Sequence, residues 1–166
     1  MTGGIGPVGW AELELGAPEI ARLGMARLAT ARVALLGTLR RDGSPRISPI
    51  EPYFSEGQLL IGVMAWSKKA ADLRRDPRCV LHSAVTDVDA GEGELKLSAL
   101  AQGAGPDLRD APARAWWLAW PPDKATVFCL RIIDAAFVDW DTERGHMTIH
   151  QWSPGYGYRW DRRAYP

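Results

Sequence analysis

The stretch VALLGTLRRDGSPRISPIEPYF, residues 33–54, decides the fold, because it contains two strands and the turn between them. Residues 33–39 are a run of leucine and β-branched side chains that is too short for a helix, which predicts a buried strand. Asp42-Gly43 is the strongest hairpin signal in the chain, since glycine tolerates the positive φ that tight hairpin turns require. A second strand is therefore expected from residue 46 to residue 54, antiparallel to the first.

The second strand of this hairpin carries an unusual number of prolines. Pro45, Pro49 and Pro52 each lack a backbone N–H, and proline is confined to strand edges, strand starts and bulges. We therefore expect that this strand is not fully paired on both sides. Its spare backbone groups either face a ligand or belong to an irregular edge strand, and the residues alone leave both interpretations open.

Turn signals and apolar runs continue along the rest of the chain. Ser55-Glu56-Gly57 predicts a second tight turn. Further strands are expected at residues 58–64, 78–85, 94–102, 126–140 (with a kink near Asp134) and 146–152, and a tryptophan-rich helix is expected at residues 112–120. A barrel is the economical way for six or seven antiparallel strands to hide their edges. We predict one domain over residues 1–166, with a helix at about 18–30, the barrel at about 33–152 and an irregular tail at 153–166.

Residues 66–78, WSKKAADLRRDPR, predict a short helix with an unusual charge distribution. Ser67 is a good N-cap, and Asp76-Pro77 ends the helix. Lys68 and Lys69 add positive charge to a terminus that unpaired N–H groups already make positive, which is the setting of a phosphate site. The alternative, which these residues leave open, is that both lysines are solvated and the misfit costs only about a few tenths of a kcal/mol.

Composition excludes several classes of function. Twenty basic and twenty acidic residues cancel, so nucleic acid is not an expected partner. No apolar run approaches the roughly 20 residues that span a bilayer, and the first ten residues lack the basic flank and apolar core of a signal peptide. We therefore expect a cytoplasmic protein that does not enter a membrane.

The cysteines and histidines give no sign of a metal or redox site. Cys79 and Cys129 lie far apart in the sequence in apolar surroundings and are expected to be reduced core thiols. His146 and His150 are expected about 13 Å apart along one strand, too far to bind one metal ion. No metal site is predicted.

Two further stretches join the opening one in a resemblance: GQLLIGVMAWSKKAADLRRDPRCVLHS (residues 57–83) and GELKLSALAQ (residues 93–102). Together they resemble the flavin-binding split-barrel family related to pyridoxamine 5′-phosphate oxidase. The order of strand, Asp-Gly turn, proline-rich strand, strand, K-x-x-x-L-R-R-D-P-R and strand carries the resemblance. It implies a mainly β fold, a six- to seven-stranded antiparallel split β-barrel with a few flanking helices. It also implies a homodimer with a flavin-type cofactor in each groove between the subunits.

The resemblance further implies a cofactor site built from two strands and the helix start. Lys69 matches the lysine that binds the cofactor phosphate, with Ser67 and Lys68 beside it. The strand that contacts the cofactor and the neighbouring strand that lies against the isoalloxazine ring supply the other matches, Arg46, Ser48, Pro49, Ile50, Val63 and Met64. The pyridoxal-phosphate-binding segments of the oxidase itself find no convincing match, so that reaction is not assigned. Catalytic residues are not identified.

Four functional hypotheses follow. The first is an FMN-binding oxidoreductase acting on a small organic substrate, in which the flavin supplies the electron transfer and the protein supplies binding. The second keeps the fold but uses a deazaflavin, whose longer anionic tail would suit Lys68 and Lys69. The third is a non-catalytic barrel that binds flavin or haem as a carrier or sensor, and the fourth is a structural dimer without a cofactor.

Overall fold

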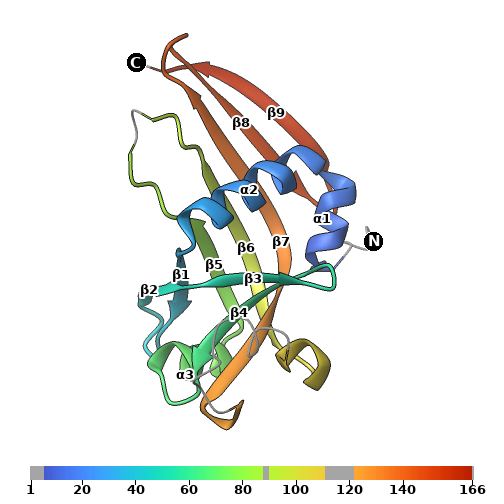
Figure 1. Ribbon diagram of the computed structural model, residues 1–166, viewed down its shortest axis with the longest axis vertical. Coiled ribbons are helices and arrows are strands. Elements are labelled where there is room, and N and C mark those ends of the chain that lie inside the picture. Colours follow the sequence, from blue (N-terminus) through green and yellow to red (C-terminus); the bar gives the residue numbers. More distant parts are fainter. Residues whose placement is uncertain (1–5, 88–89, 111–121, 166) are drawn as a thin grey trace.

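The computed structural model describes residues 6–87, 90–110 and 122–165, in which antiparallel strands dominate (Figure 1). The helix expected at residues 112–120 lies outside the described residues. The strands are β1 (Ala34–Leu39), β2 (Pro45–Ile50), β3 (Pro52–Ser55), β4 (Gln58–Met64), β5 (Arg78–Ser83), β6 (Glu94–Gly103), β7 (Ala125–Asp141), β8 (His146–Ser153) and β9 (Gly157–Ala164). The labelled helices are α1 (Trp10–Gly16), α2 (Pro18–Ala31) and α3 (Lys68–Arg75), with a 3-10 turn η1 (Pro122–Lys124), and residues 106–110 are also helical.

The predicted first hairpin is confirmed. β1 and β2 pair antiparallel from Ala34 opposite Ile50 to Leu39 opposite Pro45, and Gly43 in the turn has a φ of 82°. The second turn is also confirmed, since Ser55 pairs with Gln58 and both residues between them have positive φ, the conformation of a two-residue hairpin turn.

The strand expected from residue 46 to residue 54 is divided. β2 ends at Ile50 and β3 begins at Pro52, so the expectation of one continuous strand was wrong. The two halves have different partners: β2 pairs with β1, and β3 pairs with β4. Pro52, which has no N–H to donate, begins the second half. The expected incomplete pairing is confirmed, because β1 is the only partner of β2 among the described strands.

The described strands form one antiparallel sheet in the order β2-β1-β5-β6-β7-β4-β3, with β8 paired to β7 and β9 paired to β8. The first and last strands of this path are consecutive in the sequence but do not pair, so the sheet curls back on itself and stays open. In Figure 1, β3 and β4 cross in front of β5 and β6. The predicted split barrel is therefore confirmed.

The long strand β7 joins the barrel to the extension formed by β8 and β9. Its first residues pair with β4 and its last residues pair with β8, while β6 runs along most of its length. The register with β6 shifts between Ser98 and Ala99, which leaves Ile133 without an opposite residue. This bulge lies beside Asp134, where the sequence predicted a kink.

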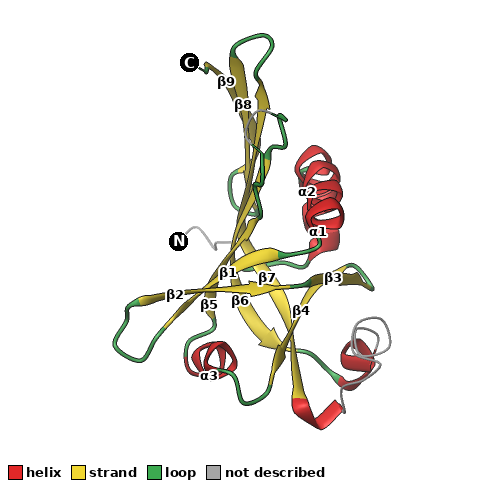
Figure 2. Cartoon of the chain, turned by 60° about the vertical axis from the view of Figure 1, so that its left-hand side comes forward, coloured by secondary structure: helices red, strands yellow, loops and turns green. Residues whose placement is uncertain are grey.

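One face of the sheet forms the core, and α2 packs against it over β5, β6 and β7. Gly24 of α2 allows a close approach, since a Cβ there would lie 2.9 Å from a methyl carbon of Leu95. Helix α1 was not predicted. Its Trp10 is buried and packs edge-to-face on Phe54, with ring centroids 4.7 Å apart. Figure 2 shows both helices on the same side of the sheet.

The C-terminal tail corrects the sequence prediction. Residues 153–166 were expected to be irregular, but β9 occupies Gly157–Ala164 and pairs with all of β8. Every residue of β9 is exposed, so backbone pairing rather than burial holds the strand, and the composition gave no signal of it. Gly157 has a φ of 73° in the turn that reverses the chain.

The two cysteines are both buried free thiols, as predicted. No described helix has the length and apolar character needed to cross a bilayer.

Candidate functional site

The start of α3 is built as the sequence predicted. Ser67 has an extended backbone, and its side-chain oxygen accepts a hydrogen bond of 3.3 Å from the backbone N–H of Ala70. No acidic residue lies in the first turn, so Lys68 and Lys69 follow the cap without a compensating carboxylate in that turn. The helix begins at a point that attracts anions, through its unpaired N–H groups and two ammonium groups.

Lys69 connects this helix start to the proline-rich strand. Its Nζ donates a hydrogen bond of 2.7 Å to the backbone carbonyl of Pro49 in β2. Burial lowers the pKa of the Lys69 ammonium. The two features that the sequence singled out, an anion-attracting helix start and a strand with spare backbone groups, therefore meet in one place.

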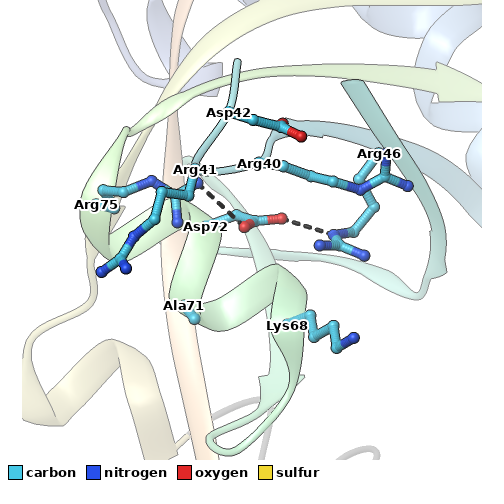
Figure 3. Close-up of a pocket in the computed structure, with 8 residues that line it drawn as sticks. All are labelled: Arg40, Arg41, Asp42, Arg46, Lys68, Ala71, Asp72 and Arg75. Carbon is cyan, nitrogen blue, oxygen red and sulfur yellow. Dashed lines mark hydrogen bonds and ion pairs between the residues drawn. The ribbon is translucent and has the colours of Figure 1, made fainter. Parts of the chain in front are cut away.

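A basic pocket of about 400 Å³ lies between α3 and the β1–β2 hairpin. It is lined by residues of the hairpin and of one face of the helix, Arg40, Arg41, Asp42, Arg46, Lys68, Ala71, Asp72 and Arg75 (Figure 3). Five of these side chains are cations and two are carboxylates. The pocket therefore carries excess positive charge, and an anion is the ligand that it suits.

Asp72 lies at the centre of the pocket and is 3% exposed. Its Oδ2 accepts hydrogen bonds from Arg46 Nε at 2.6 Å and from Thr38 Oγ1 at 3.1 Å, and its Oδ1 accepts one from Arg75 at 3.1 Å. Burial raises the pKa of the carboxyl, but the hydrogen bonds from the two arginines and the threonine outweigh it, so the pKa lies below its ordinary value. Asp72 is therefore ionised near neutral pH.

The other residues implied by the resemblance fall into two groups. Ser48 lies on the same face of β2 as Arg46 and is half-buried, and Met64 is 36% exposed at the end of β4. Ile50 and Val63 are buried in the core, so their side chains shape the wall and a ligand would meet only their backbone. None of these positions is joined to Lys69 by a side-chain hydrogen bond in the described part of the chain.

Sequence reasoning missed Asp72 and the outer arginines of the pocket. Asp72 stands in the quoted helix, four residues after Lys68, where an ordinary helical salt bridge would be the first interpretation. Its actual partners come from β1 and β2 as well as from α3, so no local pattern marks it. Arg40 and Arg41 flank the Asp-Gly turn, where charged residues are common at the surface.

The face of the sheet that points away from α1 and α2 carries an exposed apolar patch. Ile47 and Val80 both lie opposite Gly37, on either side of β1, and Leu35 lies two residues from Gly37 on the same face. Their exposed fractions are 73%, 53% and 41%. We call Leu35, Ile47 and Val80 the outer patch. It lies on the face of the sheet that α1 and α2 do not cover, because buried and exposed residues alternate along these strands.

The described histidines have local partners. His150 Nδ1 lies 2.6 Å from the hydroxyl of Tyr158, and His82 Nε2 lies 3.2 Å from a carboxylate oxygen of Glu94. In the described part of the chain, no group of three or more histidine, cysteine or acidic side chains is placed to hold a metal ion.

Comparison with known proteins places the fold. No protein-family model and no curated protein matches the sequence. PhzG from Burkholderia lata 383, solved in complex with tetrahydrophenazine-1-carboxylic acid, matches with a TM-score of 0.66 at 13% identity over 93% of each chain. A pyridoxamine 5′-phosphate oxidase-related, FMN-binding protein from Nostoc punctiforme PCC 73102 matches with a TM-score of 0.60 at 14% identity, over 90% of this chain and 96% of that one.

A haem-binding protein from Mycobacterium smegmatis also matches, with a TM-score of 0.55 at 20% identity over 86% of this chain. This chain spans 56–57% of the length of that protein and of one other neighbour. The chain therefore has the split-barrel fold of pyridoxamine 5′-phosphate oxidase-like and FMN-binding proteins, a fold that haem-binding proteins share.

Proposed function

We propose that this protein is an FMN-binding oxidoreductase that acts on a small organic substrate as a cytoplasmic homodimer. Its fold neighbours include an FMN-binding protein. The observation that carries the proposal is the contact of 2.7 Å between Lys69 Nζ and the Pro49 carbonyl, because it holds a cation where the start of α3 meets β2.

The residues present fit the phosphate of a flavin mononucleotide. A phosphate monoester carries about two negative charges near neutral pH and offers three strong acceptor oxygens. Lys68 and Arg46 line the basic pocket, Lys69 lies next to Lys68, and the unpaired N–H groups of the helix start add further donors. These donors match a dianion in charge and in hydrogen-bonding capacity.

Each part of the site has a separate task in this proposal. Ser67 caps the helix and so fixes the direction of its first turn. Lys68, Lys69 and Arg46 neutralise the phosphate, while Met64 offers an apolar surface to the ring system from the end of β4. Bound FMN would supply hydride transfer, so the chain need only bind, orient and shield it.

The homodimer is proposed from the outer patch. Exposed apolar side chains that lie next to one another on a sheet mark interaction sites more often than isolated ones do. Ile47, Gly37 and Val80 are direct neighbours across β2, β1 and β5, which makes the patch continuous. A second copy would cover this face, and the cofactor site on β2 lies at its border.

A deazaflavin-dependent reductase is the second candidate, and one observation favours it. The basic pocket holds Arg40, Arg41 and Arg75 in addition to the cations already assigned to one phosphate. A cofactor with a longer anionic tail would neutralise more of this charge than FMN would.

The spectrum of freshly purified protein gives the first test. A yellow flavin band supports the proposal, a Soret band indicates haem, and a colourless sample requires titration with FMN and with the deazaflavin. Trp66 is a suitable fluorescence reporter for the titration, because it is 78% exposed and precedes Ser67.

Lys69→Glu tests the phosphate contact. The substitution replaces a charge-assisted interaction worth about 1.5–3 kcal/mol with a repulsion, so the FMN dissociation constant should rise more than about tenfold. Arg144→Glu makes the same change of charge on the exposed turn before β8 and should leave binding unchanged. An FMN affinity that Lys69→Glu does not alter would refute the proposed role of this lysine.

A further inference from the structure

Asp72 is a buried acid in a pocket that otherwise suits anions. It accepts hydrogen bonds from Thr38 of β1, Arg46 of β2 and Arg75 of α3, and it is 3% exposed. An ionised carboxylate repels a phosphate placed nearby. Its presence in the basic pocket therefore requires an explanation beyond charge.

The contact with Arg46 uses one particular nitrogen. Arg46 donates its Nε to Asp72 Oδ2 at 2.6 Å, which leaves the two terminal nitrogens without a hydrogen-bond partner among the described residues. The guanidinium lines the pocket, and the side chain is 20% exposed. Arginine binds phosphate best through two parallel N–H groups, and in Arg46 such a pair remains available.

Arg75 provides a contrast on the other side of the same carboxylate. One of its terminal nitrogens contacts both Asp72 Oδ1 and the backbone carbonyl of Leu39. Figure 3 shows Arg75 and Arg46 on opposite sides of Asp72, with Lys68 on the side of Arg46. Arg75 is thus held by Asp72 of its own helix and by the Leu39 carbonyl at the end of β1, whereas the outer edge of Arg46 stays free to bind a ligand.

We propose that Asp72 is a positioning residue that holds Arg46 through its Nε, so that the two terminal nitrogens of Arg46 bind the phosphate of the ligand. This inference rests on the proposed function in one respect, namely that the pocket at Arg46 and Lys68 takes a phosphate. Holding the long side chain of arginine in one rotamer before binding removes an entropic cost that binding would otherwise carry.

An electrostatic role and a positioning role of Asp72 predict opposite effects of Asp72→Asn on anion binding. If Asp72 acted only through its charge, removing the negative charge would tighten the binding of an anion. If Asp72 positions Arg46, the weaker bond from Nε to an amide would release the guanidinium and weaken binding. The sign of the change therefore separates the two roles.

The experiment measures the dissociation constants of inorganic pyrophosphate and of FMN by calorimetry, for the wild type and for Asp72→Asn. We expect both constants to rise at least about fivefold in Asp72→Asn. Asp76→Asn is the matched control, because it removes the same charge from the end of the same helix, where Asp76 pairs with Arg78 outside the pocket. It should change neither constant by more than about twofold.

An NMR readout follows Arg46 directly. The Nε–H signal of Arg46, assigned by its loss in Arg46→Lys, should be protected from solvent exchange in the wild type and lose that protection in Asp72→Asn. Should Asp72→Asn not fold, Thr38→Val removes one hydrogen bond to the same carboxylate oxygen without changing charge, and it should weaken pyrophosphate binding about twofold or more.

Unchanged or tighter pyrophosphate binding by Asp72→Asn would overturn the role of Asp72, even if the wild type binds FMN. If the wild type binds pyrophosphate but not FMN, and Asp72→Asn weakens that binding, the proposed cofactor is wrong and the positioning role stands. A wild type that binds neither overturns both.

Discussion

Replacing Ile47 with lysine should dissociate the proposed dimer. Ile47 is 73% exposed in the single chain, and full burial of such a side chain contributes about 1.5–3 kcal/mol. Scaled by the exposed fraction, each copy would lose roughly 1–2 kcal/mol of association free energy. A two-fold interface contains the residue twice, so the total is about 2–4 kcal/mol. The dimer dissociation constant should therefore rise by roughly one and a half to three orders of magnitude.

Sedimentation equilibrium over a wide range of protein concentrations measures this change directly. Leu15→Lys is the matched control, because Leu15 is 86% exposed but lies on α1, on the side of the sheet opposite the outer patch. It should leave the dissociation constant at the wild-type value. If Ile47→Lys associates as tightly as the wild type does, the outer patch is not the subunit contact, and the reasoning from its exposure fails.

Two further substitutions test the stability of the fold. Hydrogen bonds from the backbone and hydroxyl of Thr86, with further ones from Asp87 and Arg27, lower the pKa of the Glu92 carboxyl to about 2. Because the pKa is lower in the folded state, this stabilisation is present above about pH 4.5 and is lost as the pH falls towards about 2. Urea unfolding should thus show Glu92→Gln less stable than the wild type at pH 7, with a smaller difference at pH 3. Gly24→Ala gains about 1 kcal/mol of helix propensity but forces a Cβ to 2.9 Å from Leu95, at a cost of about 1–3 kcal/mol. Its unfolding midpoint should be no higher than that of the wild type, and a midpoint raised by the full helical gain would contradict the close packing of α2.

Local chemistry explains why much of the barrel could be predicted from the sequence. The Asp42-Gly43 turn and the turn at Glu56-Gly57 require positive φ, and both appear in the structure where the residues indicated them. The prolines predicted that β2 lies at a sheet edge, because the lack of a backbone N–H is a property of the residue itself and does not depend on distant contacts. A kink was also predicted near Asp134, and a register shift lies beside it.

The missed elements depend on contacts that are distant in sequence or on backbone pairing alone. Helix α1 has no side-chain cap and only seven residues, so tertiary packing holds it, through the buried side chains of Trp10 and Leu13. Strand β9 buries none of its residues, and its alternation of side chains therefore carries no hydrophobic pattern. In both cases the determining partner is another element of the fold.

The candidate site likewise has one part that local sequence features predict and another that depends on contacts distant in sequence. The capped start of α3 was predictable, because a cap and two adjacent lysines are local features. The prolines predicted an edge strand with spare backbone groups, but not the partner of Lys69: only the structure shows that the Pro49 carbonyl accepts the hydrogen bond from its ammonium group. Asp72 was not predictable, because its role arises only when the β1–β2 hairpin folds over α3. A sequence can therefore indicate which cations gather at a phosphate site, whereas the groups that orient those cations become visible only in the assembled fold.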